Sequence, residues 1–341
     1  MDELMKIKRR REEFVAYQPT SVTPPFPRTL LVEISNLCNH ACVFCAYPKS
    51  TRDVKQMDLL LLDRLLVEAH QLGAVEAGFY SGAEPFTSPN LEKIILRSKQ
   101  IGYEYVYIST NGSLANEKRL GACIDNGLDS IKFTINAGDR ETYKFIHGKD
   151  HFDRVLANVR FASTYRRMVG KQVYLAVSFV VIDEPGCSNA ETGESLKHDL
   201  EGVVDEFVFV KALNQSGQTL GLAANGIEPP CVLPFNRVHI SAEGYLRMCC
   251  NDYQNYLALV DLNQTTLGAS WNAPLFQEMR RRHLEKRLEG TLCHNCMYGE
   301  NTPIQPIMAP LSVPVPATFF DFQPPEKSKA ETASRAHRTG S

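Results

Sequence analysis

Three cysteines, Cys38, Cys42 and Cys45, stand close together near the start of this 341-residue chain. Closely spaced cysteines in a reducing cell bind metal ions or iron–sulfur clusters through their thiolates. When three cysteines hold a four-iron cluster, one iron keeps an open site that can bind another molecule. A zinc site is the alternative interpretation, with His40 as the only fourth ligand nearby. Zinc sites prefer Cys-x2-Cys pairs, so the observed Cys-x3-Cys-x2-Cys spacing favours the iron–sulfur cluster.

This loop resembles the cysteine motif of the radical S-adenosylmethionine (SAM) enzymes, and Phe44 directly before the last cysteine also fits that family. The resemblance implies that the three cysteines bind a 4Fe–4S cluster and that Phe44 lies beside the adenine of SAM. The amino and carboxylate groups of SAM would chelate the fourth iron. The resemblance also implies reductive cleavage of SAM to a 5′-deoxyadenosyl radical, which removes a hydrogen atom from a C–H bond. The electron would come from an external reductant of the flavodoxin or ferredoxin type.

The elements that must position this loop alternate along the chain. Residues 28–35 are rich in Leu, Val and Ile and predict a strand that ends at the loop. Apolar residues at i, i+3, i+4 and i+7 from Leu62 predict a helix that Asp58 caps. The remaining pattern predicts strands at 75–80, 104–109, 129–135, 172–182 and 205–212, and helices at 90–101, 114–126 and near 150–168.

Strands that alternate with helices pair in parallel through right-handed crossovers. The pattern contains six strand–helix units, fewer than the eight of a closed barrel. The radical SAM resemblance implies the same α/β architecture, a partial (β/α)6 barrel that is open on one side for substrate. Parallel α/β folds place their chemistry at the carboxyl ends of the strands, where the cysteine loop begins.

The loop after the strand at 75–80 contains Gly82 and Glu84. A small residue at a strand exit lets the backbone approach a ligand, and a carboxylate can accept hydrogen bonds from an ammonium group. The loop resembles the Gly-Gly-Glu-Pro motif of the family, with Ala83 in place of the second glycine. The resemblance implies that Gly82 and Glu84 contribute to binding the SAM amino group.

Two further strand ends carry candidate residues for SAM binding. Ser109 and Asn111 belong to a Ser-Thr-Asn-Gly segment at the end of the strand at 104–109. An Asn-Gly pair is an ordinary turn signal, but in this position it resembles the segment that contacts the ribose and carboxylate of SAM. Asn136 follows the strand at 129–135, where the family often has an aspartate. The asparagine keeps a hydrogen-bonding side chain and lacks the charge.

A second cysteine group, made of Cys231, Cys249, Cys293 and Cys296, follows the region of alternating elements. Four cysteines in this order fit either zinc or an iron–sulfur cluster, and their place downstream of the first motif favours the cluster. The intervening elements are predicted as strands at 237–240 and 245–248 and a helix near 271–288. The layout resembles the twitch module, a shortened SPASM domain, of 2-deoxy-scyllo-inosamine dehydrogenase type enzymes. The resemblance implies that these four cysteines bind one auxiliary 4Fe–4S cluster.

Cys250 directly follows Cys249, and neighbouring residues in a strand point to opposite sides. If Cys249 binds the cluster, Cys250 faces elsewhere; the opposite assignment and a simple packing role are the alternatives. A thiol S–H bond is weak enough to return a hydrogen atom to a carbon radical. The arrangement resembles that of neomycin C epimerase type enzymes, which implies Cys250 as a catalytic hydrogen-atom donor.

The bulk properties are those of an ordinary globular protein, with 43% hydrophobic and 22% charged residues. A net charge of −2 provides no positive field for nucleic acid. No apolar run reaches transmembrane length and no signal-peptide core is present, so we expect a cytoplasmic protein without membrane contact. We expect an N-terminal extension at 1–27, the barrel at 28–225, the auxiliary module at 226–302 and a Pro-rich, disordered tail at 303–341.

These features predict a radical SAM enzyme that acts on a small polar natural-product substrate, such as an aminocyclitol or amino sugar. The outcome would be epimerisation or two-electron dehydrogenation. A ribosomal-peptide maturase, forming thioethers or epimerised residues, is an alternative. Such enzymes usually have an N-terminal peptide-recognition domain, for which 27 residues are too few. A non-catalytic iron–sulfur electron carrier is a third possibility, against which the SAM-contacting loops argue.

Overall fold

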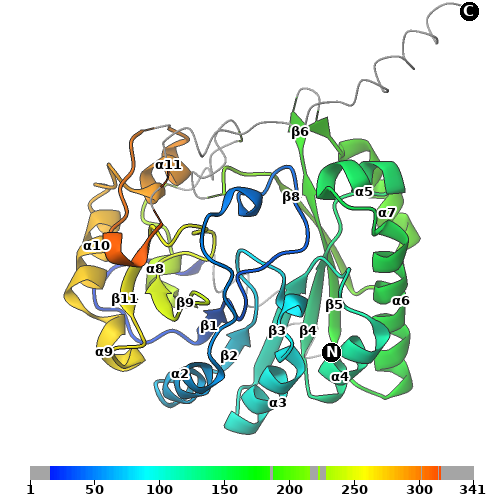
Figure 1. The fold of residues 1–341 in the computed structure, drawn as a ribbon, viewed down its shortest axis with the longest axis horizontal. Helices are drawn as coiled ribbons and strands as arrows, with labels where there is room; N and C mark the ends of the chain where they lie inside the picture. The colour runs from blue at the N-terminus through cyan, green and yellow to red at the C-terminus, as the bar shows by residue number, and fades with distance from the viewer. Residues whose placement is uncertain are drawn as a thin grey trace, which may run out of the picture.

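A nine-stranded sheet forms the centre of the molecule (Figure 1), in the order β11-β10-β9-β1-β2-β3-β4-β5-β8. The structure is a computed structural model and describes residues 16–184, 187–215, 222, 228–300, 302–313 and 315. Six neighbouring strands of this sheet pair in parallel: Thr29–Val32 (β1), Glu76–Gly78 (β2), Tyr105–Thr110 (β3), Ser130–Thr134 (β4), Tyr174–Val181 (β5) and Glu206–Lys211 (β8). Because β8 lies at an edge of the sheet, the parallel strands form an open barrel, which confirms the expected fold class.

Helices connect the parallel strands and lie along the sheet (Figure 1): Leu59–Gln71 (α2), Leu91–Ile101 (α3), Glu117–Asp125 (α4), Arg140–His147 (α5), Phe152–Met168 (α6) and Gly193–Asp199 (α7). In α2 the predicted stripe is buried, and the Asp58 side chain accepts a hydrogen bond from the Leu61 backbone at 2.8 Å. This N-cap satisfies a backbone group that the first helical turn leaves unpaired. Neither α5 nor α7 was predicted from the sequence.

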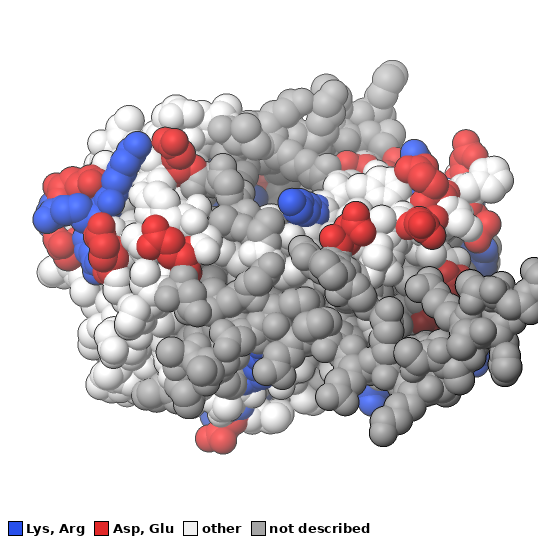
Figure 2. All heavy atoms as spheres, turned by 90° about the horizontal axis from the view of Figure 1, so that it is seen from above, with Lys and Arg blue, Asp and Glu red and all other residues white. Residues whose placement is uncertain are grey.

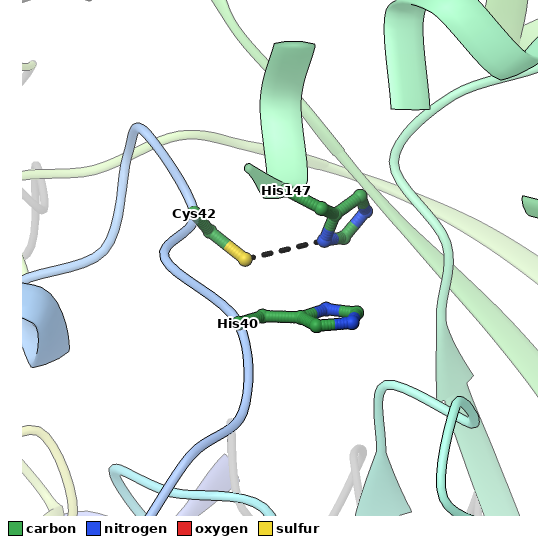
Figure 3. Close-up of side chains that lie close together, drawn as sticks. All are labelled: His40, Cys42 and His147. Atoms are coloured by element: carbon green, nitrogen blue, oxygen red, sulfur yellow. Dashed lines mark hydrogen bonds between the residues drawn. The ribbon is translucent and has the colours of Figure 1, made fainter. Parts of the chain in front are cut away.

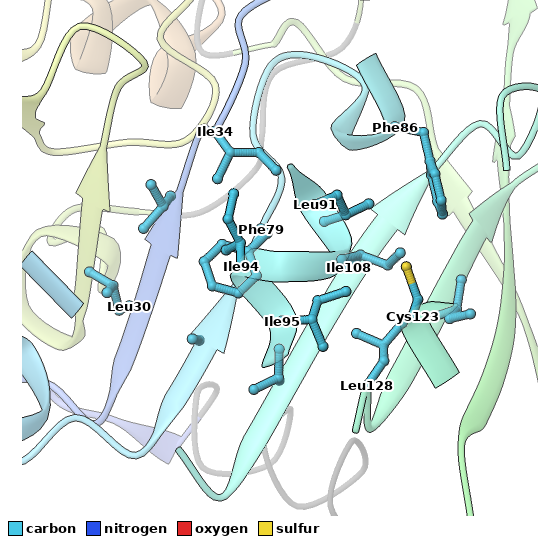
Figure 4. Close-up of a cluster of buried hydrophobic side chains, with 14 of the residues drawn as sticks. Leu30, Ile34, Phe79, Phe86, Leu91, Ile94, Ile95, Ile108, Cys123 and Leu128 are labelled. Carbon is cyan, nitrogen blue, oxygen red and sulfur yellow. The ribbon is translucent and has the colours of Figure 1, made fainter. Parts of the chain in front are cut away.

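The main hydrophobic core lies between the sheet and these helices (Figure 4). Leu30 of β1 and Ile108 of β3 pack there with Leu91 and Ile95 of α3, and Cys123 of α4 is fully buried in the same core. Successive strand residues point to opposite faces, so one side of each strand is committed to this packing. The packed strands therefore provide a rigid support for the loops at their carboxyl ends.

The opposite, inner face of the sheet carries a smaller cluster made of Leu31, Tyr105 and Tyr107. Tyr80 and Cys250 pack against this cluster. Leu31 directly follows Leu30 in β1, so the alternation along one strand separates the inner face from the main core. Cys250 thus contacts residues of the barrel interior.

The C-terminal region continues the central sheet instead of forming a separate one. Strand β9 pairs in parallel with β1, and β10 pairs antiparallel with both β9 and β11. Its elements are Leu233–Asn236 (α8), Arg237–Ile240 (β9), Tyr245–Arg247 (β10), Ala258–Asp261 (β11), Leu267–Trp271 (α9), Pro274–Leu284 (α10) and Leu292–Tyr298 (α11). The smaller elements elsewhere are Asp183–Glu184 (β6), Cys187–Ser188 (β7), Tyr47–Lys49 (η1), Pro85–Thr87 (η2), Ala190–Thr192 (η3) and Ala309–Leu311 (η4).

The described ends of the chain pack on this C-terminal region. The Trp271 indole donates to the backbone carbonyls of Pro24 and Pro25 at 3.2 Å. In the segment 303–313, which we expected to begin a disordered tail, the backbone N–H of Ile307 donates to the Tyr256 carbonyl at 2.9 Å. The expectations for 1–15 and 316–341 lie outside the described residues.

The surface seen from above shows acidic and basic side chains close to one another around its rim (Figure 2), in keeping with the small net charge. None of the helices in the described part of the chain is long and apolar enough to cross a membrane.

Candidate active site

The cysteine loop leaves the carboxyl end of β1 and is held against the end of α5. The backbone N–H of Ala41 donates to the His147 carbonyl at 3.2 Å, and that of Val43 donates to the Ile146 carbonyl at 3.0 Å. Within the loop, the Cys45 backbone donates to the Cys42 carbonyl at 3.0 Å. These bonds fix the backbone between the cysteines through contacts with a helix about a hundred residues later in the chain.

The three cysteine thiols lie near enough to oppose one another's ionisation. Burial, the Glu84 carboxylate and Cys45 raise the pKa of Cys38 to about 12. Burial, Cys45 and Cys38 raise the pKa of Cys42 well above its usual value. Without a cation, ionising these thiols therefore costs free energy. The iron cations of a cluster offset this cost, because they bind each cysteine as a thiolate. The donor set therefore fits a thiolate-bound iron–sulfur cluster.

The ligand atoms of His40, Cys42 and His147 all lie within 4.8 Å of one another (Figure 3), which revives the zinc alternative. The backbone N–H of Asn136 donates to Nε2 of His147 at 3.4 Å. Nε2 must therefore present its lone pair, which places the ring proton on Nδ1 of a neutral imidazole. Nδ1 lies 3.2 Å from Cys42 Sγ and acts as a donor to sulfur. A protonated Nδ1 does not bind zinc, so this geometry argues against that site.

Glu84 connects the cysteine loop to the loop after β3. Its backbone N–H donates to the Leu37 carbonyl at 3.1 Å. Its carboxylate accepts from the Thr110 hydroxyl at 2.6 Å and from the Asn111 backbone at 2.7 Å. Burial nevertheless raises its pKa to about 7, although these hydrogen bonds act in the opposite direction. A cation beside Glu84 would stabilise its ionised form, so the site fits the ammonium group of SAM.

The segment with Asn111 lies directly beside the cysteine loop. The Asn111 side chain donates to the side-chain oxygen of Asn39 at 2.9 Å. Gly82 faces Tyr253, since a Cβ atom at Gly82 would lie 2.7 Å from its ring. Ser109 is half-buried on β3. The structure thus brings the Gly82, Glu84 and Asn111 loops together around the cysteines.

Phe44 and Asn136 make contacts that support the fold around the site. Phe44 is buried in a small apolar cluster with Ile146 and Ile182. The Asn136 side-chain oxygen accepts from the Val180 backbone at 2.8 Å, which ties the end of β4 to β5. Its backbone N–H makes the contact with His147 described above. Whether either residue contacts SAM remains a prediction from the resemblance.

The second cysteine group lines one pocket in the C-terminal region. Cys231, Cys249, Cys293 and Cys296 surround it together with apolar side chains that include Met248, Leu257 and Met297. Burial and the neighbouring Cys231 and Cys296 raise the pKa of Cys293 well above its usual value. Helix α11 carries Cys293 and Cys296 three residues apart, on one face. Four converging thiols fit a cluster whose iron sites are all filled by protein.

Cys249 and Cys250 pack against different groups of residues, although their thiols interact with each other. Cys249 lines the pocket of the second cysteine group, whereas Cys250 packs against the inner-face cluster that contains Leu31 and Tyr107. The Cys250 backbone carbonyl accepts from the Ser81 hydroxyl at 2.7 Å, which holds this turn beside the loop with Gly82. The Cys250 thiol also hydrogen-bonds to Cys249 and lies close enough to Cys231 to raise the pKa of that thiol, so it borders both the pocket and the inner face.

Sequence reasoning did not identify two neighbours of the cysteine loop, His147 and Tyr253. The Tyr253 hydroxyl lies 3.5 Å from Cys45 Sγ, and its backbone carbonyl accepts from Ser50 at 2.9 Å. Tyr253 thus links the C-terminal region to the first cysteine group. The one available signal was a tyrosine shortly after Cys249 and Cys250, and that signal does not point to a partner so far away in the chain.

A buried ion-pair network joins the same regions. The Arg52 guanidinium contacts the carboxylates of Glu33 and Glu243 at 3.0 Å each. Although burial acts in the opposite direction, Arg247 and Arg52 lower the pKa of Glu33 to about 2. The charged form of Glu33 is therefore stabilised in the folded protein.

Comparison with known proteins agrees with this geometry. Residues 32–175 match the Radical SAM superfamily, and residues 231–297 match SPASM, the iron–sulfur cluster-binding domain. A probable GTP 3′,8-cyclase of Saccharolobus solfataricus is 32% identical over 140 residues, which are 39% of this chain and 42% of that protein. An uncharacterised protein of Methanocaldococcus jannaschii is 32% identical over 145 residues, 42% of this chain and 46% of its own. The match to these curated relatives thus spans less than half of their length.

Two solved structures share the fold. The crystal structure of BtrN in complex with AdoMet and 2-DOIA aligns with a TM-score of 0.55 at 19% identity, covering 79% of this chain and 92% of BtrN. Streptococcus suis SuiB bound to precursor peptide SuiA aligns with a TM-score of 0.61 at 15% identity, covering 82% of this chain and 70% of SuiB. SAM and iron–sulfur clusters are the cofactors that the two matched domains bind. The chain therefore carries a radical SAM domain followed by a SPASM iron–sulfur domain, in agreement with its two cysteine groups.

Proposed function

We propose that this protein removes a hydrogen atom from a small polar natural-product substrate, such as an aminocyclitol or amino sugar, and that the reaction ends in epimerisation. The observation that carries this proposal is a fifth thiol, Cys250, which borders the auxiliary pocket and also packs on the inner face of the barrel. Cys249 lines the auxiliary pocket, while Cys250 packs on the inner face of the barrel with Leu31 and Tyr107. A thiol that reaches the inner face and is not needed as a fourth ligand of the pocket can react with a substrate held in the barrel.

When bound, SAM and the first cluster supply the radical that abstracts the hydrogen atom. Cys38, Cys42 and Cys45 would hold that cluster. Glu84 would orient the SAM ammonium group, and its hydrogen bonds would hold the segment with Asn111 in place. Phe44, Gly82, Ser109 and Asn136 are the further residues that we assign to SAM binding.

Cys250 would then complete the epimerisation. Its S–H bond breaks, a new C–H bond forms on the opposite face of the substrate carbon, and a thiyl radical remains on the cysteine. One electron and one proton restore the thiol. An external flavodoxin or ferredoxin type reductant would supply the electron, and Cys231, Cys249, Cys293 and Cys296 would hold the auxiliary cluster. The proton comes from solvent.

Two other outcomes have support. In a dehydrogenation, the substrate radical would give an electron to the auxiliary cluster and a proton to a base. BtrN, crystallised with 2-DOIA, shares the fold and supports this outcome. Modification of a ribosomal peptide is the second candidate function, because SuiB, crystallised with its precursor peptide, also shares the fold.

The test is turnover by anaerobically reconstituted protein with SAM, dithionite and a panel of aminocyclitols, amino sugars and peptides. We expect 5′-deoxyadenosine and, in deuterated water, product carrying one solvent deuterium at the inverted carbon. Cys250→Ala should consume SAM but release no epimer, whereas the buried core variant Cys123→Ala should behave as wild type. Normal epimer from Cys250→Ala would overturn the donor role, and oxidised product without deuterium would establish dehydrogenation.

A further inference from the structure

The end of α5 is built into the first cysteine loop. Its last two residues, Ile146 and His147, accept backbone hydrogen bonds from Val43 and Ala41. The helix ends at Gly148 in the left-handed conformation, with a φ of +66°. A Cβ atom at Gly148 would approach the Ala41 carbonyl to 3.4 Å. These contacts fix the position of the His147 ring relative to the cysteines.

Two hydrogen bonds determine the tautomer of the His147 ring and the atom to which it donates. The Asn136 backbone N–H donates to Nε2 at 3.4 Å, so the proton resides on Nδ1. Nδ1 lies 3.2 Å from Cys42 Sγ, and Figure 3 shows the ring directed at the sulfur. A backbone N–H remains a donor at every pH, so it holds the imidazole in the tautomer that donates to sulfur.

The surroundings preserve this arrangement. His147 is 1% exposed, and the Tyr143 ring stacks on it with centroids 4.2 Å apart. His40 also approaches the ring, but its Nε2 pairs with Nδ1 of His151 at 3.1 Å. His147 is therefore the imidazole directed at Cys42, and it lies in a buried environment where a hydrogen bond to a charged sulfur is strengthened.

We propose that His147 is a positioning residue that raises the reduction potential of the SAM-binding cluster by donating Nδ1–H to the Cys42 thiolate. Hydrogen bonds to cluster sulfurs are one of the determinants of the potential of an iron–sulfur centre. Reduction adds a negative charge that is shared with the ligand sulfurs. A donor therefore stabilises the reduced state more than the oxidised state and makes the first electron easier to accept.

The test uses the full-length protein with both clusters reconstituted. His147→Leu removes the donor, whereas His147→Asn places an amide N–H near the position of Nδ1. The midpoint potential of each cluster is measured by redox titration followed by EPR. If the bond favours reduction tenfold, His147→Leu lowers the potential of the first cluster by about 59 mV. His147→Asn should recover most of this shift. The auxiliary cluster, whose pocket His147 does not line, should keep its potential in both variants.

An unchanged first-cluster potential in His147→Leu would overturn the proposal. Equal shifts in both variants would also overturn it, because they would indicate loss of packing instead of loss of a donor. If the variants fail to assemble the cluster, a second measurement on the wild-type protein tests the hydrogen bond. In wild-type protein labelled with 15N-histidine, pulsed EPR of the reduced first cluster should detect a histidine nitrogen coupling. Absence of that coupling would exclude the bond.

Discussion

The two cysteine groups have the same type of ligand and very different surroundings. The first group, Cys38, Cys42 and Cys45, is surrounded by hydrogen-bonding residues that come from α5, from the loop after β2 and from the C-terminal region. The second group lies in a pocket lined mostly by apolar side chains, with Asn251 and His283 as its polar members besides the cysteines. A site that must hold a charged cofactor needs polar neighbours to orient it. A four-cysteine site with no open iron has no cofactor to orient and needs fewer polar neighbours, which suits electron transfer.

Replacing Cys42 by alanine should have the largest effect, because it removes one of only three ligands of the first cluster. We expect loss of 5′-deoxyadenosine formation and a fall from about eight to about four irons per chain. Iron analysis, EPR and product chromatography measure this. Cys123→Ala is the matched control for loss of a cysteine outside both groups. Undiminished SAM cleavage by Cys42→Ala would contradict the assignment of the first site.

Replacing Cys293 by alanine should separate the two sites. The auxiliary cluster is lost, but the first cysteine group is unchanged, so SAM cleavage should continue without formation of product. The ratio of 5′-deoxyadenosine to product, measured with the substrate found by the panel above, reports this uncoupling. If product formed at the wild-type ratio, the second group would have no part in turnover.

Replacing Arg52 by alanine should weaken the ion pairs that join the segment after the first cysteine group to the C-terminal region. Its guanidinium is 4% exposed and pairs with Glu33, which is 1% exposed. Breaking a buried ion pair from one side costs roughly 3–5 kcal/mol when it leaves an uncompensated charge. Arg247 lies 3.5 Å from Glu33 and compensates part of that charge, so we expect a smaller cost for Arg52→Ala. Urea unfolding of cluster-free Arg52→Ala measures the cost.

The exposed pair between Arg97 and Asp63 supplies the control for this prediction. Both side chains are more than two-fifths exposed, at 46% and 44%. Exposed pairs contribute about 0–1 kcal/mol, so Arg97→Ala should unfold at nearly the wild-type urea concentration. Equal destabilisation by the two substitutions would mean that burial of the Arg52 network does not matter.

The smallest expected effect is the contribution of Glu84 to the pH dependence of protein stability. Burial raises its pKa from 4.5 to about 7 in the folded protein. The folded state thus holds this proton more tightly than the unfolded chain, and the resulting stability is complete below pH 4.5 and lost as the pH rises through 7. In cluster-free protein, Glu84→Gln should reduce the loss of stability between pH 5 and 8.

Urea unfolding at both pH values measures this difference. The exposed variant Glu194→Gln should show the wild-type pH dependence. An identical pH dependence in Glu84→Gln and wild type would show that Glu84 ionises as easily in the folded protein as in the unfolded chain.

Much of the barrel could be predicted from local patterns. The stripe from Leu62 to Ala69 identified α2, and runs of branched apolar residues identified the parallel strands. Helix α5 was missed because it is short and its buried residues, Tyr143, Ile146 and His147, do not form a long apolar repeat. Strand β11 was missed because four residues carry little alternation. The stretch with Cys293 and Cys296 was not predicted as a helix, although the Thr291 side chain caps α11.

The candidate site was predictable to the extent that its ligands are close in sequence. Cys38, Cys42 and Cys45 are recognisable from spacing alone, because a short loop must bring their thiolates together. The roles of Glu84 and Asn111 depended on the resemblance, and the structure adds the hydrogen bonds that connect them. Tyr253 could not be predicted, because it is separated from Cys45 by 208 residues.

The sequence by itself determined which residue types can bind metal and that alternating strands and helices support them, since these properties depend on local spacing. Tertiary structure alone decided which way Cys249 and Cys250 face and which side chain meets the Cys42 sulfur. His147 lies 105 residues away from Cys42 in the chain, and only the packing of α5 against the cysteine loop brings their side chains to 3.2 Å. Contacts of this range depend on the whole sheet, because its strand order decides which loops meet at its carboxyl edge.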